Sequence, residues 1–262
     1  MNASSKHSTA YWYLSDSSVL IVRSWKHIFK NIDQLLSLVM QPLMFMLLFR
    51  YVFGGAIDTG PVTYVNYLMA GIIVQTAAFG ATTTSMNVAL DLKRGIVDRF
   101  RSLPMSNSTV LVGHVTADLA RNLISTVVMI LVGLLVGFRP TAGVREWLLA
   151  AGLLLSFTFA ISWVSAILGL LARSVEAVMW ISFMLIFPIT FASSAFVPTA
   201  GMPWVLRIFA ENQPVTHTIE ALRALTVGTP IGAHGWIALT WWTAITLVSI
   251  PVCGWMFRRY GR

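Results

Sequence analysis

Residues 147–172, WLLAAGLLLSFTFAISWVSAILGLLA, carry no charged side chain and decide what kind of protein this chain is. A helix needs roughly 20 predominantly apolar residues to cross the hydrocarbon core of a bilayer, and this run is longer than that. The whole chain has the same character, because 56% of its 262 residues are hydrophobic, 11% are charged and the mean hydropathy is +0.75. The sequence therefore predicts an all-α integral membrane protein.

Five further runs without Asp, Glu, Lys or Arg flank this segment, and the six runs together predict six transmembrane helices. The helices are expected near 35–53, 64–88, 112–138, 147–171, 176–197 and 236–257. An even number of crossings places both termini on one side of the membrane. The Lys and Arg residues are concentrated in the segments that would share the cytoplasm with the termini. The net charge of +8 is therefore attributed to topology and to contact with anionic lipids, and not to nucleic acid.

Two charged amphipathic segments lie outside the apolar runs. Residues 17–33 predict a helix in the inner membrane interface, with an apolar stripe and a basic face. Residues 91–104, DLKRGIVDRFRSLP, predict a second short helix, with Asp91 as the cap at its start and Pro104 as its stop. Its apolar residues recur at helical spacing, so this helix suits a groove on a soluble partner.

The region between the fifth and sixth predicted spans is apolar but broken by four prolines. Short external, re-entrant helices are expected over 198–228, and one of them, residues 215–227, ends at Gly228. Glu220 and Arg223 stand one helical turn apart and are expected to pair. Both an exposed pair at the level of the lipid headgroups and a role in gating remain open at this stage.

The chain lacks the motifs of the common membrane enzymes and ATPases. No H-E-x-x-H, G-x-S-x-G or C-x-x-C motif occurs, and Cys253 is the only cysteine. There is no G-x-x-x-x-G-K-[ST] loop, so ATP is expected to bind to a second polypeptide. Asp118 and Arg121, one turn apart near the end of the third span, are interpreted as a structural pair.

Two groups of residues resemble a known family. The stretch from Gly95 to Pro104, GIVDRFRSLP, resembles the cytoplasmic loop of ABC-2 type exporter permeases, particularly the daunorubicin-resistance branch. The outer-side signature of that branch is similar to Phe187-Pro188, Phe196-Val197-Pro198, Met202-Pro203-Trp204, Asn212-Gln213-Pro214-Val215-Thr216 and Arg223. Gln213 departs from the many relatives in which Asn is followed directly by Pro.

The resemblance implies one ABC-2 type transmembrane domain over 1–262, with residues 91–104 as a coupling helix that contacts a separate ABC ATPase subunit. The expected contact residues are Lys93, Arg94, Gly95, Ile96, Val97, Asp98, Arg99, Phe100, Arg101 and Pro104. ATP and Mg²⁺ are expected in two copies of that ATPase, with no cofactor in this chain. A second copy of the chain or a sibling permease is implied, in the plasma membrane of a bacterium.

The expected function is export of amphiphilic drug-like or lipid-like molecules from the cell. Residues expected to line the substrate path are Met44, Phe45, Gln75, Phe79, Phe183, Phe187 and Phe191. Those expected at the outer gate are Phe196, Pro198, Glu220 and Arg223. The alternative for the path residues is ordinary packing against neighbours or lipid. Alternative functions are export of a polysaccharide or lipid-linked glycan, a membrane-embedded lipid-modifying enzyme, and a non-transporting scaffold.

Overall fold

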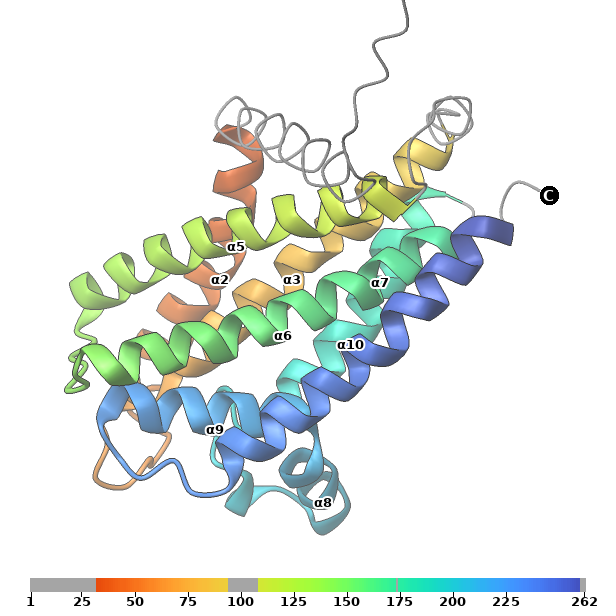
Figure 1. Ribbon diagram of the computed structural model, residues 1–262. Coiled ribbons are helices and arrows are strands. Elements are labelled where there is room, and N and C mark those ends of the chain that lie inside the picture. Colours follow the sequence, from red (N-terminus) through yellow and green to blue (C-terminus); the bar gives the residue numbers. More distant parts are fainter. Residues whose placement is uncertain (1–31, 94–107, 173, 260–262) are drawn as a thin grey trace, which may run out of the picture.

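Helices make up most of the residues that the computed structural model describes, which are 32–93, 108–172 and 174–259 (Figure 1). The α-helices are α2 (Ile32–Leu48), α3 (Tyr64–Lys93), α5 (Ser108–Val136), α6 (Val144–Leu171), α7 (Val175–Phe191), α8 (Trp204–Asn212), α9 (Pro214–Val227) and α10 (His234–Arg259). A π-helical turn, η1 (Phe49–Phe53), continues α2, and a 3-10 turn, η2 (Thr199–Gly201), precedes α8. No strand occurs in these three ranges, which confirms the all-α prediction for them.

Four of the described helices are long and apolar enough to cross a membrane. These segments are Tyr64–Lys93, Leu111–Val136, Val144–Leu171 and His234–Phe257. The other two predicted spans correspond to shorter apolar helices, Val39–Phe53 and Val175–Phe191. The chain is therefore a multi-pass membrane protein, and six complete crossings stay a prediction.

Two predicted boundaries differ from the structure. Asp91 lies in the last turn of α3 instead of starting a new helix, because α3 continues to Lys93. The fifth apolar helix ends at Phe191 rather than at 197, and the amide of Ala192 closes it by donating to the carbonyl of Pro188. Residues 17–31 and 94–104, where the interfacial and coupling helices are expected, lie outside the described residues.

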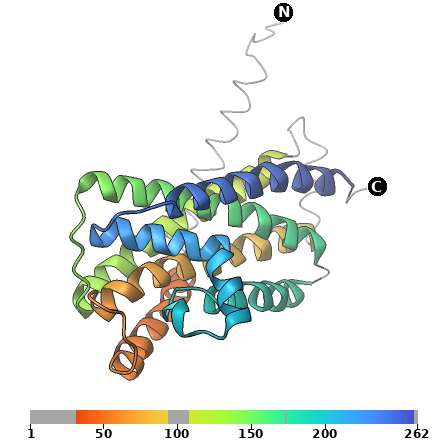
Figure 2. The ribbon, with the colours of Figure 1, turned by 90° about the horizontal axis from the view of Figure 1, so that it is seen from below.

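α3 is the central helix of the bundle and packs against α2, α5, α6, α7 and α9. Within its most apolar window 83% of residues are buried, against 22% for α10. α2 and α10 lie on opposite sides of the bundle (Figure 1, Figure 2). We call the two ends of the bundle the Lys93 end, where α3 finishes, and the Tyr64 end, where α3 starts and α8 and α9 lie.

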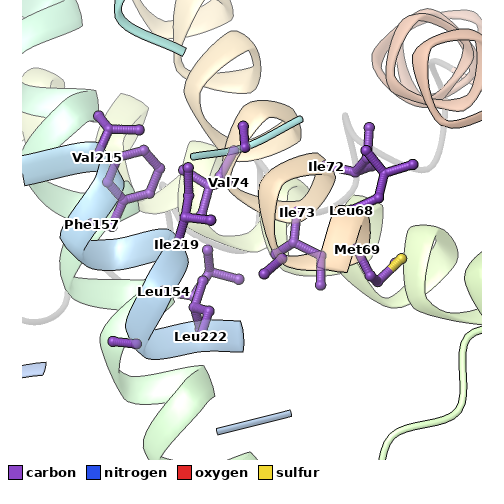
Figure 3. Packing of buried hydrophobic residues seen from close by; sticks show 14 of the residues in the cluster. Leu68, Met69, Ile72, Ile73, Val74, Leu154, Phe157, Val215, Ile219 and Leu222 are labelled. Carbon is purple, nitrogen blue, oxygen red and sulfur yellow. The ribbon is translucent and has the colours of Figure 1, made fainter. Parts of the chain in front are cut away.

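The main hydrophobic core joins α3, α6 and α9. Figure 3 shows Ile219 of α9 beside Val74 of α3, with Phe157 of α6 close by. α9 has the end signals of a soluble helix: Pro214 occupies its first turn, where no amide donor is needed, and Gly228 ends it with φ at +78°. The helix predicted over 215–227 is therefore confirmed.

Gly71 allows α3 to touch the backbone that follows α7. A Cβ atom at position 71 would collide with the carbonyl oxygen and Cα of Ala195. Since both partners are backbone atoms, neither can move away by changing a rotamer. The close approach of α3 to residues 192–198 therefore requires glycine at this position.

We expect Gly71→Ala to destabilise the protein by about 1–3 kcal/mol, because the added methyl group overpacks a rigid contact. Gly152→Ala is the matched control, since no atom lies within 4 Å of a Cβ at that helical position. Alanine favours a helix over glycine, so the control variant should be unchanged or more stable. Thermal unfolding of both variants in detergent measures the difference, and equal melting temperatures would contradict the contact.

Candidate functional site

The segment that follows α7, residues 192–198, is buried although it is not helical, and we call it the anchored segment. Ser193, Ser194, Ala195 and Phe196 are all buried. A backbone that leaves a helix inside a membrane protein must find donors for its carbonyl groups, because lipid supplies none. The protein supplies these donors from side chains.

Three alternate carbonyls of the anchored segment each accept a hydrogen bond from a different element. Gln213 Nε2, between α8 and α9, donates to the carbonyl of Ala192. Arg223 Nη2 of α9 donates to the carbonyl of Ser194 at 2.6 Å. The hydroxyl of Tyr64, at the start of α3, donates to the carbonyl of Phe196 at 2.9 Å. The segment is thus tied to α3 and α9 through its own backbone.

Arg223 makes three further contacts besides its hydrogen bond to Ser194. Its side chain is only 9% exposed, and its Nε donates to the carbonyl of Tyr67 at 3.1 Å. The guanidinium also lies 3.5 Å from the centroid of the Tyr67 ring, within cation–π distance. Its Nη1 pairs with Glu220 Oε1 at 2.6 Å. One permanently charged fork therefore joins α9, α3 and the anchored segment.

The residues predicted at the outer gate lie in and around the anchored segment, and one of them, Arg223, is more buried than expected. Glu220 and Arg223 form the expected pair, but Arg223 is buried, so the pair is not an exposed one at headgroup level. Phe196 is buried within the anchored segment, and Pro198 caps the 3-10 turn η2. The sequence alone did not single out Tyr64, because a tyrosine hydroxyl indicates a contact only once its acceptor is known. It noted Gln213 merely as a departure from the family pattern.

Phenylalanine rings form a continuous row along α7, which we call the phenylalanine ladder. Phe79 lies 6.3 Å from Phe183, Phe183 lies 5.1 Å from Phe187, and Phe187 lies 4.1 Å from Phe191 between ring centroids. Phe191 in turn contacts Phe196 at 4.7 Å and Phe45 at 5.4 Å. The ladder thus connects α7, α3 and α2 and ends on the anchored segment.

Two of the predicted path residues lie outside this ladder. The side chain of Met44 is 66% exposed on α2. Gln75 is buried in α3, and neither atom of its amide group has a hydrogen-bond partner among the described residues. The structure therefore brings together Phe45, Phe79, Phe183, Phe187 and Phe191, and does not add these two residues to them.

At the Lys93 end, only part of the predicted ATPase contact falls within the described residues. Lys93 is exposed at the end of α3, and the other predicted contact residues lie outside the described ranges. Asp91, two residues earlier, pairs through Oδ2 with His114 Nε2 of α5 at 2.8 Å. This pair was not predicted, because its members are separated by the predicted coupling helix.

A histidine pair lies at the Tyr64 end, where Nδ1 of His217 in α9 is 2.9 Å from Nδ1 of His234 in α10. Burial and the neighbouring His234 lower the pKa of His217. Across the described parts of the chain, no three His, Cys, Asp or Glu side chains gather in a way that would hold a metal ion. The pair therefore serves to join α9 to α10.

Comparisons with known proteins agree with this architecture of apolar, membrane-length helices. A family model described as ABC-2 type transporter matches residues 16–227. The chain is 33% identical over 196 residues to the daunorubicin resistance ABC transporter permease of Streptomyces coeruleorubidus, covering 75% of this chain and 69% of the relative. It is 28% identical over 222 residues to a probable doxorubicin resistance ABC transporter permease of Mycobacterium tuberculosis, covering 82% and 78%. A putative transport permease of Porphyra purpurea is 23% identical over 222 residues, covering 82% and 75%.

The fold and these similarities define a multi-pass transport permease. The chain belongs to the ABC-2 type transporter family, and its similarity supports the drug-resistance branch of permease subunits. The matched region contains the anchored segment, the phenylalanine ladder and the predicted coupling helix. The relatives named above are transport permeases, in agreement with the family that the chain belongs to.

We expect Arg223→Lys to lower the free energy of unfolding by about 1.5–3 kcal/mol, because an ammonium group cannot make all of the contacts of the fork and loses at least one charge-assisted hydrogen bond. Arg207→Lys is the matched control, since Arg207 pairs with Glu211 at 2.8 Å on the exposed surface of α8. An exposed pair contributes little, so this variant should stay within about 0.5 kcal/mol of the wild type. Chemical denaturation in detergent measures both, and equal effects would contradict the role of Arg223.

Proposed function

We propose that this chain is the permease subunit of an ATP-driven exporter that moves amphiphilic drug-like or lipid-like molecules out of a bacterial cell. It works with two copies of a separate ABC ATPase subunit and with a second copy of itself or a sibling permease. The Lys93 end faces the cytoplasm together with both termini. The relatives named for daunorubicin and doxorubicin resistance support the choice of cargo class.

The phenylalanine ladder is the observation that carries this proposal. It extends along α7 from Phe183, which is 44% exposed, to Phe196, which is 1% exposed. A row of aromatic faces offers apolar surface and stacking to a flat or apolar cargo, while the carbonyls and the Arg223–Glu220 pair near its end provide polar groups. In the proposed orientation, the ladder leads from the cytoplasmic half of the membrane to the anchored segment on the outer side.

Energy enters through the Lys93 end in this mechanism. The predicted coupling helix, residues 91–104, contacts the ATPase, and ATP with Mg²⁺ binds in that partner. Closure of the two ATPase subunits moves the coupling helices, and this rigid-body motion is transmitted to α2, α3 and α7. Because α3 is tied to the anchored segment through Tyr64 and the Gly71 contact, its movement reaches the outer end of the ladder.

The side of the bundle that carries α2 and α7 is suited to face the second permease. Several large apolar side chains are exposed there, among them Met44 at 66%, Trp180 at 73% and Met184 at 76%. In a lone subunit these side chains meet lipid, and in a dimer they meet the other permease. A path between two subunits then has the phenylalanine ladder along its wall.

We expect Phe100→Asp, or charge reversal at Arg94 and Arg101, to abolish ATP-dependent transport while membrane insertion is retained. Disrupting such a contact costs roughly 2–5 kcal/mol, which is enough to lose a modest interface. Arg145→Glu is the matched control, because Arg145 is exposed at the opposite end of the bundle. Affinity co-purification followed by mass spectrometry measures ATPase binding, and vesicle assays measure transport. Transport by the isolated permease without any nucleotide-hydrolysing partner would refute the proposal.

We expect Phe187→Ala to lower the transport rate of an aromatic amphiphilic dye about tenfold, because about 1.4 kcal/mol of ring contact is lost. Phe159→Ala is the matched control, since Phe159 contacts Trp163 edge-on at 6.3 Å in a different cluster. Dye efflux from vesicles, normalised to protein amount, measures the effect. An equal loss in both variants, or no loss in either, would show that the ladder is packing and would favour a different cargo such as a glycan.

A further inference from the structure

The α3–α5 contact changes character along its length. A Cβ atom at Gly133 of α5 would lie 2.6 Å from Met69 Sδ of α3, and one at Gly80 of α3 would collide with the amide group of Asn122. These two contacts fix an antiparallel register. The part toward the Tyr64 end is apolar, since Ile73 there faces Met129 in this register.

The part of the same contact toward the Lys93 end is polar. The register places Thr76 and Ala77 of α3 level with Thr126 and Ser125 of α5, and it places Thr84 level with Asp118. We call this polar half of the α3–α5 contact the polar seam. Its members on α5 are Asp118, Asn122, Ser125 and Thr126, all between 0% and 6% exposed.

The polar seam leaves hydrogen-bonding groups without partners. Both amide atoms of Asn122, the hydroxyls of Ser125 and Thr126, and Oδ1 of Asp118 have no hydrogen-bond partner among the described residues. Ser162 of α6 donates to the other oxygen of Asp118, and Thr84 of α3 also lies close enough to interact with this carboxylate. Arg121 Nη1 lies 3.8 Å from Asp118 Oδ1, which is too long for a hydrogen bond.

Neither lipid nor the present packing can satisfy these groups. Hydrocarbon offers no hydrogen bonds, and the contact of Gly80 with the side chain of Asn122 holds the two helices close together at this point. Unpaired buried polar groups are therefore a source of free energy that is released when water reaches them. Several of these groups gather in this half of the α3–α5 contact, while others lie elsewhere, at Ser194, Gln213 and Thr216.

The Asp91–His114 pair closes this seam at its outermost point, next to residues 94–107. The two side chains are 22% and 21% exposed, so the pair lies at the boundary between the bundle and its surroundings. It joins α3 to α5 nearer to the Lys93 end than the polar seam does. A force on the Lys93 end of α3 therefore acts on the Asp91–His114 pair before it acts on the polar seam.

We propose that the polar seam is a water-binding site that is closed in this conformation and opens from the Lys93 end during the transport cycle, when α3 and α5 separate beyond the Asp91–His114 pair. Water then hydrates Asn122, Ser125 and Thr126, while the apolar part of the same contact stays closed. This inference rests on the proposed function, because the ATPase supplies the force that separates the helices.

Thiol labelling tests the proposal. Cys253, the only cysteine, is replaced by alanine, and Ser125→Cys or Met129→Cys is added as a single buried thiol one turn apart on α5. The permease is purified with the ATPase that accompanies it, reconstituted in vesicles, and treated with a water-soluble methanethiosulfonate reagent with and without ATP plus vanadate. We expect Ser125→Cys to react at least tenfold faster in one nucleotide state than in the other, and Met129→Cys to react slowly in both.

Equal, slow labelling at both positions in every state would overturn the proposal, even when the ATPase is bound and active. If no ATPase accompanies the permease, the proposed function fails, but labelling of the permease alone still tests whether the polar seam binds water. In that case, faster labelling of Ser125→Cys than of Met129→Cys in the permease alone supports a water-binding site, and equal labelling overturns it.

Adding Asp91→Asn should raise the labelling rate at Ser125→Cys severalfold, whereas Glu211→Gln, which removes a charge from an exposed pair on α8, should not.

Discussion

The backbone of residues 192–198 must have hydrogen-bond donors in a place where lipid offers none, and the arrangement of the Tyr64 end follows from this constraint. Arg223 supplies one of these donors, since its buried guanidinium reaches the carbonyl of Ser194, and it also contacts the carbonyl of Tyr67 and the carboxylate of Glu220. Tyr64 and Gln213 supply the remaining donors. These hydrogen bonds hold an irregular segment in place, and α3, α7 and α9 are positioned around it.

The phenylalanine ladder depends on that arrangement. Phe196 belongs to the anchored segment and also forms the last step of the ladder, where it contacts Phe191 and stacks on Phe49 at 4.4 Å. The hydrogen bond from Tyr64 to the carbonyl of Phe196 therefore fixes the end of an apolar row as well as a stretch of backbone. The polar groups of the anchored segment lie at the end of the row of rings where the chain leaves α7.

At the Tyr64 end, three buried backbone carbonyls of the anchored segment accept hydrogen bonds, although Ser194 Oγ, Gln213 Oε1 and Thr216 Oγ1 have no hydrogen-bond partner among the described residues. Toward the Lys93 end, Asn122 and Ser125 lie in the α3–α5 contact, likewise without partners in the described part of the chain.

Hydropathy and local signals determined much of this protein. Runs without charge predicted the apolar helices, Pro214 and Gly228 bounded α9, and the one-turn spacing of Glu220 and Arg223 predicted their pair, because each depends on neighbours in sequence. Only the tertiary structure decided that Arg223 is buried against Tyr67, that the phenylalanines of α2, α3 and α7 form one row without Met44 or Gln75, and that α3 continues through Asp91 to meet His114. These features come from contacts between segments far apart in the chain, whose register depends on close approaches such as Gly71 to Ala195, and no local pattern encodes that register.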